Sequence, residues 1–139
     1  MKKLPLSMAQ QVAEVASGLQ KERTGHAPQS VSVVQSDGTL VITLHGALSP
    51  AEQALSKTPE GAAQVQEFHR QLFAKSSDAI REEIKRITGV AVREAAAEVE
   101  TTTGTVVQAF SSGTLVHVFL LAQSISADAW SETGLANPV

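Results

Sequence analysis

The middle of the chain reads Gly46-Ala-Leu-Ser-Pro-Ala-Glu-Gln-Ala-Leu-Ser-Lys-Thr-Pro-Glu-Gly61, and this stretch carries the signals that organise the fold. Ser49 is a typical N-cap residue, and Pro50 suits the first position of a helix because its missing N–H is not needed there. Glu52 lies where its carboxylate can reach back to the cap and close a capping box. The first half of the stretch therefore predicts the start of a short helix.

A second helix start follows within the same stretch. Thr58 and Pro59 repeat the cap and the first-turn proline, and Glu60 lies where the helix dipole favours a negative charge. Two starts so close together predict that the short helix ends at a corner and that a new helix begins there.

Apolar residues recur at helical spacing from this corner to Gly89, which suits a helix end. They are Val65, Phe68, Leu72, Phe73, Ile80, Ile84 and Ile87. The sector that they form is broad for a monomer, so we expect a homodimer that associates through helices.

The residues before the corner predict a helix and a hairpin. Ser7 begins another capping-box signature, and helical spacing of apolar residues continues to about Arg23. Two apolar segments, 31–35 and 40–44, then flank the dipeptide Asp37-Gly38, which favours a tight hairpin turn because it tolerates positive φ.

Three more strands are predicted after the long helix, over residues 90–101, 105–110 and 114–122. The economical arrangement for them is a three-stranded antiparallel meander. The whole order predicts an α+β domain with its helices packed on one face of the sheet. We expect one domain over residues 1–123 and a partly disordered tail over residues 124–139.

Composition limits the classes of function. Of the 139 residues, 42% are hydrophobic and 18% are charged, and the formal net charge is −3, so we expect no nucleic-acid partner. The chain has no cysteine, which excludes disulfides and thiolate chemistry and is compatible with the cytoplasm, where we expect this protein. No apolar run approaches the roughly 20 residues of a membrane span. We therefore expect neither an export signal nor direct membrane insertion.

Motifs for catalysis, metals and cofactors are missing from the sequence. The four histidines lie on four different predicted elements, so no metal site is expected, and His45 at a strand end is the one with an edge position. There is no GxSxG, SxxK or phosphate-binding glycine loop, so we predict no cofactor and identify no catalytic residue. One hypothesis for function, which ranks below two others given below, is an enzyme that uses His45 with a strand carboxylate.

Seven residues are candidates for an interaction or ligand site. Helical phase places Glu83 near the apolar sector, where a carboxylate at the rim of an interface needs a basic partner. The others come from the corner stretch and the strand end before it. The complete set is His45, Ser49, Glu52, Lys57, Thr58, Glu60 and Glu83.

The Gly46–Gly61 stretch, together with Ile87-Thr-Gly-Val90 and Thr101-Thr-Thr-Gly104, resembles the MpsC family of small bacterial proteins. The resemblance runs from about Gln20 to Ala122. It implies a soluble protein that accompanies the membrane subunits of a Na+-translocating, membrane-potential-generating system. It supplies no catalytic residues.

Two hypotheses for function rank above the enzyme. The first is a non-enzymatic accessory or regulatory module, homodimeric, that binds a membrane transport complex or a regulatory protein. The alternative is a small-anion or small-ligand sensor that binds at the helix N-termini around Ser49 and Thr58. The prolines there remove donors, and Glu52 and Glu60 repel an anion, so the sensor ranks second.

Overall fold

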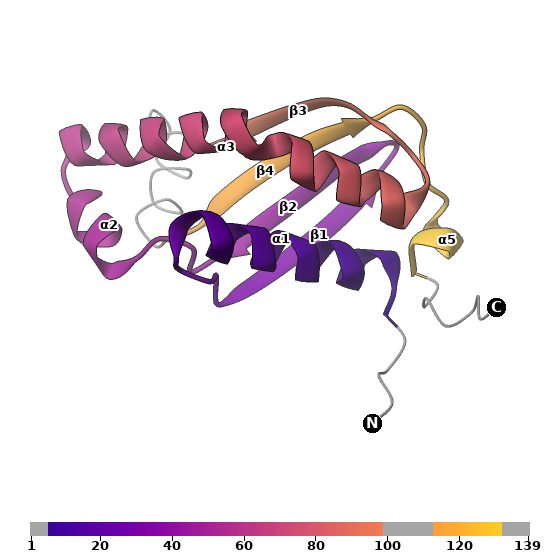
Figure 1. The fold of residues 1–139 in the computed structure, drawn as a ribbon, viewed down its shortest axis with the longest axis horizontal. Helices are drawn as coiled ribbons and strands as arrows, with labels where there is room; N and C mark the ends of the chain where they lie inside the picture. The colour runs from indigo at the N-terminus through magenta and orange to yellow at the C-terminus, as the bar shows by residue number, and fades with distance from the viewer. Residues whose placement is uncertain (1–5, 99–112, 132–139) are drawn as a thin grey trace.

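The computed structural model describes residues 6–98 and 113–131 of the chain. Along these residues a helix is followed by two strands, then by two helices and then by further strands, as the sequence predicts (Figure 1). The elements are α1 (Met8–Thr24), β1 (Ser30–Ser36), β2 (Thr39–His45), α2 (Pro50–Leu55), α3 (Pro59–Thr88), β3 (Val92–Glu98), β4 (Leu115–Leu121) and α5 (Ala127–Ser131).

Over the described residues, the sheet has four strands in the order β1-β2-β4-β3, and every neighbouring pair is antiparallel. The predicted hairpin is confirmed: β1 and β2 pair in register from Ser30↔His45 to Ser36↔Thr39. Its turn has φ of 50° at Asp37 and 80° at Gly38, the left-handed values that a two-residue hairpin turn requires.

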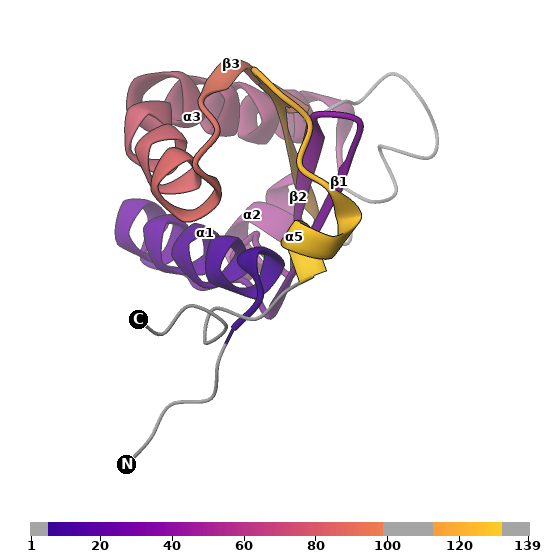
Figure 2. The same cartoon turned by 90° about the vertical axis from the view of Figure 1, so that its right-hand side faces the viewer.

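Helices α1 and α3 cover one face of this sheet and contact each other, which confirms the predicted layers (Figure 2). Alternate residues of the two central strands point into the core between the layers, so that burial follows the period of two that a strand imposes. The buried side chains on these strands include Leu40, Ile42, Leu44, Leu115 and Phe119.

The predicted three-stranded meander is wrong. In a meander, the strand over residues 105–110 would separate the other two, but β3 pairs directly with β4 in antiparallel register. Segment 105–110 itself lies outside the described residues. The strand rich in Leu, Val and Phe, β4, lies between β2 and β3 and buries alternate residues beneath the helices, whereas β3 with its charged and alanine residues lies at an edge of the described sheet.

Most of the broad apolar sector of α3 is buried within the single chain. Val65, Phe73, Ile80 and Ile84 are buried against the sheet and α1, whereas Phe68 stays 50% exposed. The sector that suggested a dimer is therefore mostly the inner face of a single domain.

Part of the C-terminal segment also packs against the rest of the domain. Ile125 is buried, Trp130 packs against the core, and α5 contacts α1. Residues 132–139 of the predicted tail lie outside the described part of the chain. None of the helices over residues 6–98 and 113–131 combines the length and apolar character that crossing a membrane requires.

Candidate functional site

The corner between α2 and α3 begins with the capping box that the sequence predicts. The Ser49 hydroxyl accepts a hydrogen bond from the Glu52 backbone N–H at 3.3 Å, and Oε1 of Glu52 accepts one from the Ser49 N–H at 3.0 Å. The Ser49 hydroxyl also lies 3.2 Å from the same carboxylate oxygen. These bonds hold the Glu52 side chain along the first turn of α2.

The second cap fixes the start of α3 close against the end of α2. Oγ1 of Thr58 accepts a hydrogen bond from the Gly61 N–H at 3.0 Å. A Cβ atom at Gly61 would lie 1.8 Å from the Leu55 carbonyl oxygen, so only glycine permits this approach. The two helices can therefore meet at a tight corner because the sequence places glycine at their contact.

His69 of α3 completes the arrangement. Its side chain is 3% exposed, and its Nε2 atom lies 2.8 Å from Oε2 of Glu52, whose side chain is 21% exposed. Burial by itself would raise the pKa of the Glu52 carboxyl, but the hydrogen bonds from His69 and Ser49 outweigh it, and the pKa lies below its usual value. Glu52 is therefore an anion at neutral pH.

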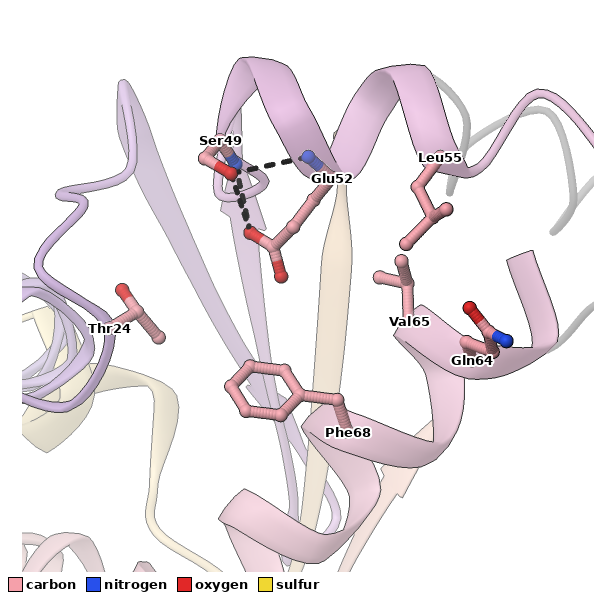
Figure 3. A pocket seen from close by; sticks show the side chains of 7 residues that line it. All are labelled: Thr24, Ser49, Glu52, Leu55, Gln64, Val65 and Phe68. Atoms are coloured by element: carbon pink, nitrogen blue, oxygen red, sulfur yellow. Dashed lines mark hydrogen bonds between the residues drawn. The ribbon is translucent and has the colours of Figure 1, made fainter. Parts of the chain in front are cut away.

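Glu52 faces a pocket of about 360 Å³ between the end of α1 and the corner. Figure 3 shows the carboxylate pointing into the space above the Phe68 ring. The lining residues are Thr24, Ser49, Glu52, Leu55, Gln64, Val65 and Phe68. Leu55 and Phe68 are 46% and 50% exposed, so the pocket combines a fixed negative charge with an apolar wall open to solvent.

Two of the seven predicted site residues, Ser49 and Glu52, meet at this pocket. Thr58 caps α3 behind it, and Lys57 and Glu60 are exposed at the corner without lining the pocket. The capping role explains Glu52 only in part, because its second oxygen binds His69.

The other two predicted residues lie elsewhere. His45 ends β2, and its Nε2 atom lies 3.1 Å from the Ser32 hydroxyl on β1. Glu83 does have a basic partner, but this partner is Arg86 on the same helix, whose NH2 atom lies 2.6 Å from Oε1 of Glu83. Neither residue lines the pocket.

Sequence reasoning missed His69, although the sequence holds a signal for it. His69 lies four residues after Val65 and four before Phe73, on the buried stripe of the long helix. A polar side chain in such a stripe needs a partner. The partner could not be chosen from spacing, because it lies on another helix.

A second group of polar side chains is buried between α1 and the sheet, around a cavity of about 10 Å³. His117 of β4 lies there against the Phe73 ring, with ring centroids 4.6 Å apart. Burial, with smaller contributions from Arg23 and His69, lowers the pKa of His117 to about 3. The Nε2 atom of Gln20 in this cavity has no hydrogen-bond partner among the described residues. A cavity of this volume is too small for a ligand, so we assign this group a structural role.

Metal ligands do not gather in the described part of the chain. Over residues 6–98 and 113–131, no three His, Cys, Asp or Glu side chains come together in a way that could hold a metal ion. The candidate site is therefore the pocket beside Glu52 and His69.

The fold and this pocket define a small α+β domain in which two helices cover one face of an antiparallel sheet. The family model MpsC, described as "Na+-translocating membrane potential-generating system (MpsC)", matches residues 6–121. The chain belongs to the MpsC family, as its corner stretch predicts. Comparison with curated proteins and with solved structures found no significant match.

Proposed function

We propose that this protein is a non-enzymatic accessory or regulatory component of a Na+-translocating, membrane-potential-generating system and that it acts by binding another protein on the cytoplasmic side. The family match over residues 6–121 supports the link to that system. The observation that carries a binding role is the pocket at the corner, where Leu55 and Phe68 remain about half exposed beside the Glu52 carboxylate. Large apolar side chains around a charged group are typical of a recognition surface.

The chemistry of Glu52 and His69 favours binding over catalysis. A general base works best when its pKa is near the working pH, whereas the pKa of Glu52 lies below its usual value. His69 is 3% exposed and its Nε2 atom is engaged by Glu52, so this atom does not face a substrate. The pair holds a charge in place and is poorly suited to move a proton.

A genetic experiment tests this function. Deleting the gene in the source organism should lower the membrane potential that depends on Na+, measured with a potential-sensitive dye in media with and without Na+. The wild-type gene should restore this potential, and Phe68→Ser should restore it less well because it removes an exposed apolar contact. An unchanged potential in the deletion strain would overturn the proposal.

We extend the proposal to self-association, and β1 supports it. β1 is an edge strand of the described sheet, its seven residues contain no charge and no proline, and its Val34 is 60% exposed. Charged residues and prolines normally protect an edge strand, and a strand that lacks them pairs readily with another strand. Sedimentation at micromolar concentration should show a dimer that Val34→Lys dissociates and Phe68→Ser does not, and a monomeric wild-type protein would remove this part.

An anion sensor at the helix N-termini is the weaker alternative. The cap side chains of Ser49 and Thr58 accept backbone N–H groups there, and the Glu52 carboxylate occupies the first turn of α2. Titration calorimetry with bicarbonate and with phosphate should give no heat of binding, and saturable heat would restore this alternative.

A further inference from the structure

The pocket at the corner carries the negative charge of Glu52. Among the described residues that line it, Glu52 alone is ionisable. Its Oε1 atom receives two contacts from Ser49, and its Oε2 atom receives one from His69. A carboxylate offers about four lone-pair sites, so Oε2 retains capacity for one more donor. The site is therefore prepared for a hydrogen-bond donor with a positive charge.

The wall opposite this carboxylate fits the stem and the flat face of such a donor. The Phe68 ring lies below the carboxylate (Figure 3), and half of its surface is exposed. A guanidinium group can stack on an aromatic face while its N–H groups bind a carboxylate, and its methylene stem can cover apolar side chains such as Leu55. The negatively charged Glu52 carboxylate would repel an anion.

We propose that this pocket receives an arginine side chain from a protein partner. The identity of the occupant as part of a protein rests on the proposed function. The surface supports a peptide occupant, because residues beside the arginine can cover the parts of Leu55 and Phe68 that its side chain leaves exposed. Cytoplasmic segments of membrane proteins carry an excess of Lys and Arg, so a membrane subunit supplies this chemistry.

A titration with defined peptides tests the pocket without the partner. The probes are the capped tripeptide Leu-Arg-Leu and the same peptide with citrulline, which keeps the shape of arginine and lacks its charge. Amide NMR signals of Glu52, Val65 and Phe68 should shift and saturate with the arginine peptide. The citrulline peptide should bind at least tenfold more weakly.

Variants of the protein make the test specific. Glu52→Gln should weaken binding of the arginine peptide at least tenfold, and Phe68→Leu, which keeps an apolar side chain and loses the ring, should weaken it about threefold. Glu60→Gln is the matched control, because it removes the same charge from an exposed position at the same corner. It should leave binding unchanged. Dispersed NMR spectra of each variant establish that it is folded.

Three results would overturn the inference: no saturable shift with the arginine peptide, equal binding of the citrulline peptide, or an equal loss with Glu60→Gln and Glu52→Gln. The proposed function fails by a different measurement, an unchanged membrane potential in the deletion strain. The two failures can therefore be told apart.

Discussion

The imidazole of His69 and the carboxylate of Glu52 lie 2.8 Å apart, although they are 17 positions apart in the chain. The pair links α3 to the first turn of α2 across the corner. One carboxylate thus closes a helix cap with one oxygen and binds a buried histidine with the other. This double use fixes both the corner and the direction of the Glu52 carboxylate, the one ionisable group among the described residues that line the pocket.

The first prediction concerns the strength of this pair. In a double-mutant cycle with Glu52→Gln and His69→Leu, we expect a coupling free energy of about 1–2 kcal/mol, because the hydrogen bond is partly buried and charge-assisted. Unfolding in urea measures it. The exposed pair Glu67 and Arg70, 3.9 Å apart on the same helix, is the control and should couple by less than about 0.5 kcal/mol. Additive effects at Glu52 and His69 would contradict the prediction.

The second prediction concerns the glycine at the corner. Gly61→Ala places a methyl group 1.8 Å from the Leu55 carbonyl oxygen, so the corner must shift, at a cost of about 2–4 kcal/mol in unfolding free energy. Gly18→Ala is the control, since its Cβ would meet no atom within 4 Å inside α1. It should stabilise the protein by about 0.5–1 kcal/mol. Thermal unfolding distinguishes the two, and a stable Gly61→Ala protein would show that the corner is not tight.

The third prediction concerns acid and His117. The pKa of this buried histidine is about 3, below the roughly 6.5 of an unfolded chain, so the unfolded state binds the proton first. Its contribution to stability is complete above pH 6.5 and is lost as the pH falls from there towards 3, by up to about 1.4 kcal/mol per pH unit. His117→Gln should flatten this slope, measured by urea unfolding at a series of pH values. Val116→Thr, a neutral change on the same strand, should leave it intact.

The fourth prediction concerns Glu52 at lower pH. Because its folded-state pKa is depressed, its stabilising contribution is present above the unfolded value of about 4.3 and is lost as the pH falls through the folded pKa. The stability difference between wild type and Glu52→Gln should therefore shrink below about pH 4. A difference that stays constant down to pH 2 would mean that the carboxylate charge contributes nothing.

The fifth prediction separates two phenylalanines of α3. Phe68 is half exposed and Phe73 is buried. Phe68→Ala should change the unfolding free energy by less than about 1 kcal/mol, whereas Phe73→Ala should cost about 3–5 kcal/mol because it leaves a cavity in the core. Equal losses would show that Phe68 supports the fold, and its exposed surface would then no longer argue for a partner.

Features that depend on a few neighbouring residues could be predicted from the sequence. The caps at Ser49 and Thr58 formed as expected, since each hydroxyl accepts an N–H three residues away. The hairpin turn at Asp37-Gly38 formed for the same reason, because φ preference is a local property. The family was also recognised from the corner stretch, and the match to residues 6–121 confirms it.

Features that depend on distant partners could not be predicted. The direct pairing of β3 with β4 was missed because strand order is set by which strand gains most from central burial, and hydrophobic alternation does not specify a neighbour. Among the candidate residues, Ser49 and Glu52 do reach the pocket, whereas His45 and Glu83 lie away from it, with partners Ser32 and Arg86.

By itself, the sequence determined where α1, α2 and α3 begin, where the hairpin turns and to which family the chain belongs, because caps, turns and periodicity are properties of short segments. Only the tertiary structure decided that His69 meets Glu52, that β3 lies beside β4 and that Phe68 stays exposed while Phe73 is buried. These facts depend on how α3 packs across α2 and the sheet, and packing joins residues that the chain keeps far apart.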